Sequence, residues 1–307
     1  MIATVTCNPS LDYHMRLAGA LKVGTLNRAD ETTIRVGGKG INVTQVLTNL
    51  GVPNMAYGFV AGKTGQMLCS MIEEAGLPFT PIPVGRGSTR INAKIHGLRE
   101  TEINGDGPTI GQSEVSMLVE KLAALQKGDT VVLSGSLAPG LSPSWYGALL
   151  EELTGKGIRF VVDATGQSLT GTLCCRPFLI KPNAKELGDL FDVEIKTVED
   201  AAHYGKRLVE MGARYVLVSR GGDGAVLVGP KGDYWSSSAP QGMVVDTIGS
   251  GDSMVAGFLY GFAHGKEAEV EALRWGTACG SASAFCDHLA GRSEIEAVLG
   301  RVRVTRW

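Results

Sequence analysis

A stretch of small residues that leads into an apolar helical pattern carries the clearest chemical signal in the chain. It spans residues 246–257 and reads Asp-Thr-Ile-Gly-Ser-Gly-Asp-Ser-Met-Val-Ala-Gly. Gly249 and Gly251 let the backbone turn its amides outward around Ser250, where the positive end of the helix favours a phosphate or an oxyanion. Asp252 would stand beside this anion hole as a base for phosphoryl transfer, which depends more on position than on basicity.

The same aspartate has a simpler interpretation. An Asp that follows a glycine commonly caps the N-terminus of a helix, so Asp252 could have a structural role only. We also expect the positive helix end to lower the pKa of its carboxyl group. The two interpretations differ in where the side chain lies, because a base must face a cleft.

A second glycine-rich turn precedes another predicted helix. Residues 37–42 read Gly-Gly-Lys-Gly-Ile-Asn. Glycines permit close approach of a ligand to the backbone, Lys39 can neutralise a phosphate, and Asn42 can hydrogen-bond hydroxyl groups. The alternative is a tight loop with an exposed lysine. Neither this turn nor residues 58–64 complete a dinucleotide fingerprint or a nucleoside-triphosphate loop.

Further polar groups follow predicted strands, at the edge where parallel sheets bind ligands. Ser134 ends one strand. Asn183 and Glu186 follow another and are spaced as a helix-capping pair, although they could instead orient Mg²⁺-bound water. Residues 219–224, Ser-Arg-Gly-Gly-Asp-Gly, lie between two strands and could be an ordinary hairpin. Arg90 could clamp a phosphate through two hydrogen bonds, or it could be solvated.

The elements that would position these groups alternate between strand and helix. Such alternation indicates an α/β fold, with a mostly parallel sheet covered by helices on both faces. We expect strands at 2–6, 56–60, 130–133, 159–162, 178–180, 215–219 and 225–228. We expect helices at 41–50, 67–75, 145–153, 198–211, 252–264 and 267–285.

Two segments interrupt this alternation, at about 11–36 and 89–106. Both have extended character, and residues 90–95 alternate between polar and apolar side chains. We expect the two segments to pair as a small separate sheet. Because a sheet without helices of its own must cover its apolar face, it should form a lid over a cleft and could pack against another subunit.

Composition sets broad limits. The 307 residues are 44% hydrophobic and 20% charged, as in ordinary globular proteins, and this length does not fix the number of domains. The formal net charge of −2 gives no reason to expect nucleic acid or an anionic membrane as a partner. No apolar run approaches the roughly 20 residues of a membrane helix, and no signal sequence is evident, so we expect a cytoplasmic protein. The six scattered cysteines, most of them expected to be buried, predict neither a zinc cluster nor a disulfide framework.

Four motifs occur in the order found in ribokinase-like sugar kinases of the phosphofructokinase B type, and the resemblance spans nearly the whole chain. They are Gly-Gly-Lys-Gly-Ile-Asn at 37–42, Ser-Gly-Ser-Leu at 134–137, Lys-Pro-Asn-x-x-Glu at 181–186 and Gly-Ser-Gly-Asp-Ser at 249–253. The resemblance implies one ribokinase-like kinase domain over 1–307, a three-layer sandwich with a mostly parallel central sheet, and a small β-sheet lid.

The resemblance also implies a role for each matching residue. Asp252 corresponds to the catalytic base, and the anion hole corresponds to Gly249, Ser250 and Gly251. The sugar-phosphate site corresponds to Asp12, Gly38, Lys39, Asn42, Arg90, Asn92 and Ser134. The side that holds ATP and Mg²⁺ corresponds to Lys181, Asn183, Glu186, Ser219, Gly221 and Gly224, with Glu186 reaching the metal through water.

Within this family, residues 90–95 and 101–105 look most similar to members that phosphorylate the 6-hydroxyl of fructose 1-phosphate. Members that act on tagatose 6-phosphate follow closely, and a 6-phosphofructokinase is a further alternative. A regulator that binds a sugar phosphate without catalysis is also possible in principle, although Asp252 beside its glycine turn argues against it. The expected partners are a small sugar phosphate, ATP and a second copy of the chain bound through the lid.

Overall fold

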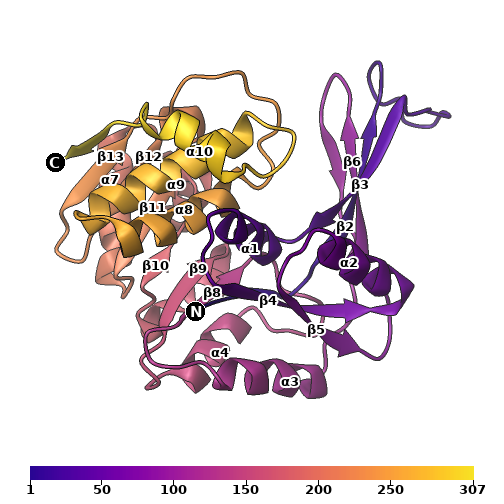
Figure 1. Ribbon diagram of the computed structural model, residues 1–307, viewed down its shortest axis with the longest axis horizontal. Coiled ribbons are helices and arrows are strands. Elements are labelled where there is room, and N and C mark those ends of the chain that lie inside the picture. The colour runs from indigo at the N-terminus through magenta and orange to yellow at the C-terminus, as the bar shows by residue number, and fades with distance from the viewer.

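The structure, a computed structural model of residues 1–307, is built around one large sheet (Figure 1). Its ten strands follow the order β14-β13-β12-β11-β10-β9-β8-β1-β4-β5. The strands from β5 to β11 run parallel, and the three at the other edge are antiparallel. Their bounds are β1 Ile2–Thr6, β4 Asn54–Ala61, β5 Phe79–Val84, β8 Thr130–Ser134, β9 Arg159–Asp163, β10 Leu179–Ile180, β11 Tyr215–Ser219, β12 Ala225–Val228, β13 Tyr234–Ser237 and β14 Val304–Arg306.

Helices cover both faces of this sheet. One buried apolar cluster joins the sheet to α3 Gln112–Ala123, α4 Trp145–Leu153, α5 Gly166–Thr170, α6 Ala184–Phe191 and α7 Val198–Glu210. The other joins it to α1 Lys39–Asn49, α8 Ser250–His264, α9 Ala268–Ala284 and α10 Arg292–Leu299. Successive strand side chains point to opposite faces, so Phe160 and Val162 enter the first cluster and Val161 the second. The result is a three-layer sandwich.

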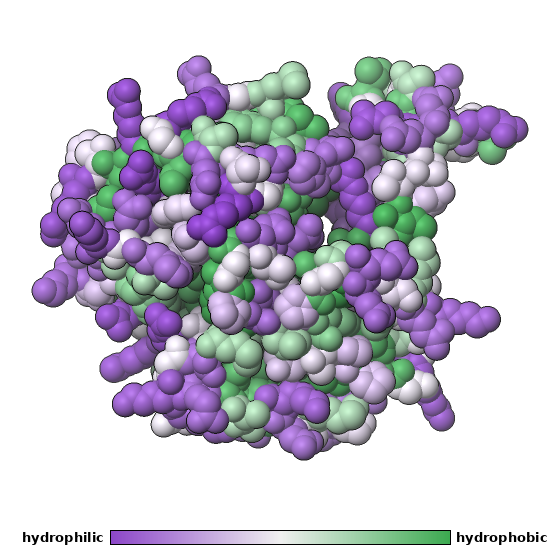
Figure 2. Space-filling view, in the orientation of Figure 1, coloured by the Kyte–Doolittle hydropathy of each residue, from purple (hydrophilic) through white to green (hydrophobic).

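Four other strands form a small separate sheet that projects from the main body (Figure 1). Its order is β3-β2-β6-β7, with β2 and β6 parallel and the outer pairs antiparallel. The bounds are β2 Ser10–Arg16, β3 Glu31–Gly37, β6 Arg90–His96 and β7 Thr101–Ile103. Helix α2, Gly62–Glu74, lies at its base, where Leu68 packs with Leu11. The space-filling view shows a hollow between the small sheet and the body (Figure 2).

The two faces of the small sheet differ in polarity. On one face Asp12 lies opposite Arg35 and Asn92 in the strand register. The next residue along β2, Tyr13, points to the other face and lies opposite Ile34 of β3. The polar face supplies groups to the cavities described below, while the other face leaves apolar side chains exposed.

The carboxyl ends of the parallel strands meet at one edge of the large sheet. Thr6, Ser134 and Asp163 are register partners across β1, β8 and β9 and are the last residues of these strands. Lys181 follows β10 directly, and Ser219 ends β11. In open α/β sheets this edge is where ligands bind.

Most elements predicted from the sequence are confirmed, including the two segments that pair as a small sheet. Helix α2 begins at Gly62, earlier than predicted, and α3, α5, α10, β5, β13 and β14 were not predicted; the start of α6 was indicated only by the predicted capping pair of Asn183 and Glu186. Strand β5 contains Pro81 and Pro83, which argue against a strand, but it lies at the sheet edge, where missing donors cost least. No helix is both long and apolar enough to cross a membrane.

Candidate active site

The glycine turn before α8 has the geometry of an anion-binding helix start. Gly249 is the N-cap residue, with a φ of 76°, and α8 begins at Ser250. No hydrogen bond within the protein occupies the amides of Gly251 and Asp252. The buried hydroxyl oxygen of Ser250 also lacks a partner. A bound phosphate could form hydrogen bonds with all three of these unsatisfied groups.

Asp252 is buried but lines a cavity, and it does not cap the helix. Its carboxylate Oδ2 accepts a hydrogen bond of 2.8 Å from Asn42 Nδ2. Burial, assisted by the negative charge of Asp163, raises the pKa of Asp252 to about 6. The expectation of a lowered pKa is therefore wrong. The loss of solvent around the carboxylate raises its pKa more than the positive charges of the helix end and of Lys39 lower it.

Two lysines share one buried aspartate at the centre of the site. Asp163 Oδ2 lies 3.3 Å from Lys39 Nζ, and Asp163 Oδ1 lies 3.2 Å from Lys181 Nζ. Burial opposes ionisation of Asp163, but the two ammonium groups still hold its pKa below the ordinary value. The pKa of Lys39 is raised in spite of its burial, because Asp163 and Asp252 are close to it. Lys39 thus stays charged between two carboxylates.

Asp163 is a site residue that the sequence interpretation missed. The available signal was a carboxylate placed directly after the predicted strand 159–162, at the edge where parallel sheets bind ligands.

A large cavity of about 760 Å³ collects most of the predicted residues. Asn183 and Glu186 lie in its wall as a reciprocal capping box, which confirms the predicted capping pair. Glu186 uses Oε2 for that bond, so Oε1 can still face a ligand. Arg220 N donates to Gly224 O, and so the connection between β11 and β12 is a tight hairpin that also lines the cavity. The predicted residues in its wall are Lys39, Lys181, Asn183, Glu186, Ser219, Gly221, Gly224, Gly249, Ser250, Gly251 and Asp252.

A second cavity, of about 360 Å³, lies between the small sheet and the body. Asn42 and Asp12 both line it. Asp12 Oδ1 accepts hydrogen bonds from Ser10 Oγ at 2.7 Å and from Asn92 Nδ2 at 2.8 Å. Since Asn42 also holds Asp252, this hydrogen bond connects the wall of the second cavity to that of the first.

Not every predicted substrate residue reaches these two cavities. Arg90 lines a third, open pocket together with Ser136, and its Nε donates to Asn8 O at 3.1 Å. Lys39 and Arg90 therefore lie in the walls of different cavities. Ser134 is fully buried and lines none of the three, because it is still part of β8. Gly38 is the N-cap of α1, with a φ of 137°, and positions Lys39 rather than lining a cavity.

Comparison with known proteins gives a consistent picture. Residues 6–293 match the profile of the pfkB family of carbohydrate kinases. The chain is 42% identical to a 1-phosphofructokinase of Bacillus subtilis over 306 residues, covering 100% of both chains. It is 37% identical to a 1-phosphofructokinase of Borreliella burgdorferi, covering 99% of this chain and 98% of that one. A D-tagatose-1-phosphate kinase of Bacillus licheniformis is 31% identical, with 99% of each chain covered.

Solved structures of Escherichia coli phosphofructokinase-2 share the fold. They are 28% identical to this chain and cover 98% of both chains. The complex with fructose-6-phosphate has a TM-score of 0.89, and the tetrameric inhibited form has a TM-score of 0.88.

The charges around Asp252 predict how its carboxyl group titrates. It should lose its proton at about pH 6, since burial raises its pKa to that value. In Asp163→Asn the midpoint should move to lower pH, because a neighbouring negative charge is removed. In Lys39→Met it should move to higher pH, because the removed charge is positive. Carbon-13 NMR of labelled aspartate measures the titration midpoint of Asp252 in the wild type and in both variants, and Asp252→Asn is the control that assigns its signal. Equal midpoints in the three proteins would contradict the proposed effect of the neighbouring charges.

Proposed function

The chain belongs to the pfkB family of carbohydrate kinases, and we propose that it transfers the γ-phosphoryl group of ATP to the 6-hydroxyl of fructose 1-phosphate. The products are fructose 1,6-bisphosphate and ADP. The two 1-phosphofructokinases are more similar to this chain than the D-tagatose-1-phosphate kinase is. The observation that carries the proposal is the Asn42–Asp252 hydrogen bond, which joins a carboxylate in the wall of the large cavity to a side chain that lines the second.

In this proposal the large cavity holds ATP and the second holds the sugar. The amides of Gly251 and Asp252 and the hydroxyl of Ser250 would bind the transferred phosphoryl group. Asp252 would accept the proton of the attacking hydroxyl, and its pKa of about 6 leaves it ionised at neutral pH. Lys39, already flanked by carboxylates, would balance the charge that develops on the phosphoryl oxygens.

The donor set around the large cavity also fits a magnesium ion. Glu186 Oε1 has no hydrogen-bond partner and could hold the ion directly or through water, beside Asn183. Mg²⁺ would neutralise negative charge on the ATP phosphates. Lys181, whose Nζ lies beside Gly251 of the glycine turn, would bind a phosphate. The roles of Ser219, Gly221 and Gly224 would be to line the nucleotide site through the backbone of the hairpin.

For the sugar phosphate, the second cavity and the pocket beside it provide complementary groups. Asp12 would accept hydrogen bonds from sugar hydroxyls, because Ser10 and Asn92 fix its carboxylate. Arg90 would bind the existing phosphate in the open pocket, where Ser136 supplies a hydroxyl. Ser136 thus replaces Ser134 in the proposed phosphate site.

Replacement of Asp252 tests the role of its carboxylate. Asp252→Asn should lower kcat by about 10² to 10⁴, because the amide cannot accept the proton. Steady-state ADP release measures the change. Asp189→Asn is the control, because Asp189 is exposed on α6, pairs with Lys185 and lines neither of the two cavities. Near-normal turnover in Asp252→Asn would contradict the assignment.

A substrate panel tests the proposed specificity. Fructose 1-phosphate should give the highest kcat/KM among fructose 1-phosphate, tagatose 1-phosphate, tagatose 6-phosphate, fructose 6-phosphate and free fructose. Arg90→Gln should raise the KM for the phosphosugars far more than that for free fructose, since only the phosphosugars carry the anion that Arg90 would bind. A preference for free fructose would overturn the phosphosugar assignment. Binding by calorimetry with no ADP release would instead support a non-catalytic regulator.

We also propose that two copies of the chain associate through the small sheets. Register places Ile34, Tyr13, Ala93 and Ile103 in one row across the four strands, on the face opposite Asp12. Ile34 is 39% exposed and Ile103 is 61% exposed. A second copy would cover this apolar row, which would otherwise face water. The expectation of a cytoplasmic location stays a prediction.

Light scattering tests the association. The wild-type protein should show twice the mass of one chain. The double variant Ile34→Lys, Ile103→Lys should show the mass of one chain, because each lysine would lose its water in the contact. Met211→Lys is the control, because Met211 is 50% exposed and lies at the end of α7 on the main body. A wild-type monomer would contradict the proposed contact.

A further inference from the structure

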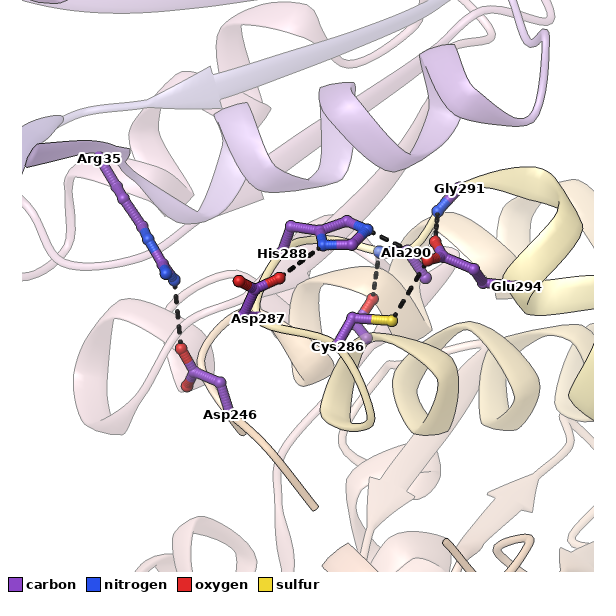
Figure 3. A network of polar contacts seen from close by, with 9 residues as sticks. Arg35, Asp246, Cys286, Asp287, His288, Ala290, Gly291 and Glu294 are labelled. Atoms are coloured by element: carbon purple, nitrogen blue, oxygen red, sulfur yellow. Dashed lines mark hydrogen bonds and ion pairs between the residues drawn. The ribbon is translucent and has the colours of Figure 1, made fainter. Parts of the chain in front are cut away.

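Three side chains of metal-ligating types cluster beside the second cavity, which the proposed function assigns to the sugar; Cys286 and His288 line that cavity, and none of the three is a proposed catalytic group. Cys286 and His288 follow α9, and Glu294 lies in the first turn of α10 (Figure 3). Glu294 Oε1 lies 3.5 Å from Cys286 Sγ and 3.2 Å from His288 Nε2. The three potential ligand atoms all lie within 4.8 Å of one another. In the absence of a metal they hydrogen-bond to each other.

We propose that Cys286, His288 and Glu294 form a binding site for a divalent transition-metal ion of the Zn²⁺ class, through which the ion inhibits the kinase. A thiolate, an imidazole and a carboxylate are the ligands that Zn²⁺ prefers. Bond lengths of about 2.0 to 2.3 Å in a tetrahedron place ligand atoms about 3.3 to 3.6 Å apart. The two distances to Glu294 are close to this range, so small side-chain rotations suffice. Only three protein ligands are present, which leaves a position for water.

The surroundings hold two of the ligands in the orientation that a metal requires. His288 Nδ1 lies 2.8 Å from Asp287 Oδ1. A proton on Nδ1 would bind this carboxylate and leave the lone pair of Nε2 for the ion, as is common around protein-bound zinc. Glu294 Oε2 accepts a 2.6 Å hydrogen bond from the amide of Gly291, which leaves Oε1 directed at the cluster. The His288 side chain is 57% exposed, so an ion can enter from solvent.

The number and spacing of the cysteines did not predict this cluster. Only Cys7 and Cys279 of the six cysteines are buried, so the expectation that most would be buried is wrong. The absence of a Cys-x-x-Cys pair argues against a structural zinc cluster with several cysteines. A mixed site with one cysteine needs no such spacing, and here all three ligands lie in residues 286–294, where the loop after α9 leads into α10.

The segment between the ligands contacts the anion hole, which gives an ion a route to activity. A Cβ added at Gly249 would lie 2.5 Å from Leu289 Cδ2, so Leu289 packs directly on the turn. The amide of Ala290 donates to Ser283 Oγ, which in turn hydrogen-bonds Ser253 Oγ beside Asp252. An ion that joins this loop to α10 would restrict Leu289 and the turn. Phosphoryl transfer would then slow, because the amides of the turn could adjust less to the phosphoryl group.

Cobalt titration tests the site without any substrate. Co²⁺ added to the wild-type chain should give a thiolate-to-metal charge-transfer absorption that saturates at one ion per chain and disappears on addition of Zn²⁺. Cys286→Ser and His288→Gln should abolish this absorption. Asp287→Asn should weaken binding by about 10- to 100-fold, because the orienting carboxylate is lost. Circular dichroism and thermal melting confirm that each variant is folded.

The exposed cluster of Glu151, Cys174 and Cys175 provides the matched control. The double variant Cys174→Ser, Cys175→Ser removes the other pair of neighbouring thiols and should leave the cobalt absorption unchanged. An absorption that persists in Cys286→Ser, or that disappears only in the double variant, would overturn the proposed site.

Inhibition is measured separately, as ADP release at saturating Mg²⁺, ATP and fructose 1-phosphate. Wild-type kcat should fall as Zn²⁺ fills the site, with a midpoint equal to the Kd from competition with Co²⁺, and a chelator should restore it. For Cys286→Ser, kcat should be the same in the presence and absence of Zn²⁺. If Zn²⁺ binds and kcat does not change, the inhibitory role is wrong and the proposed metal site stands. Lack of kinase activity in all samples would count against the proposed function and leave the cobalt result standing.

Discussion

The hydrogen bond between Asn42 and Asp252 is the contact on which the organisation of the active site depends. It joins α1, which follows β3 of the small sheet, to α8, which begins at the glycine turn. Because Asp252 is buried, its carboxylate would be costly without a donor and nearby cations. Asn42 supplies the donor, and Lys39 and Lys181 supply the charge. The same contact therefore offsets the cost of burial and joins the proposed base, in the wall of the large cavity, to a side chain that lines the second cavity.

The surrounding charges form a balanced set. Asp163 and Asp252 carry two negative charges, and Lys39 and Lys181 carry two positive ones. Entry of a nucleotide would bring excess negative charge to this set. Both lysines line the large cavity and pair with Asp163, while Asp252 is held by Asn42. The two positive charges of the lysines therefore lie where the phosphates of a nucleotide in this cavity could reach them.

Local patterns in the sequence predicted the layers of the fold and the glycine turns at helix starts, because such turns are set by neighbouring residues. With the family resemblance they predicted eleven of the 24 residues that line the large cavity. Groups that depend on tertiary placement were harder to predict. Asp163 became recognisable as a site residue only when Lys39 and Lys181 met it across strands. The pKa of Asp252 was predicted in the wrong direction, because a local rule for helix ends does not include burial by the rest of the fold.

In the proposed function, the register of the small sheet would link substrate binding to self-association. Its polar face carries Asp12 and Asn92, and its opposite face carries the proposed contact row with Ile103. Two hydrogen bonds, Asn92 Nδ2 to Asp12 Oδ1 and the amide of Gly105 to Asn92 Oδ1, fix the alignment of β2, β6 and the loop after β7. A shift of one residue would exchange the faces, which would remove Asp12 from the cavity and bury charge in the contact. Formation of the sugar site and formation of the contact surface therefore depend on the same strand alignment.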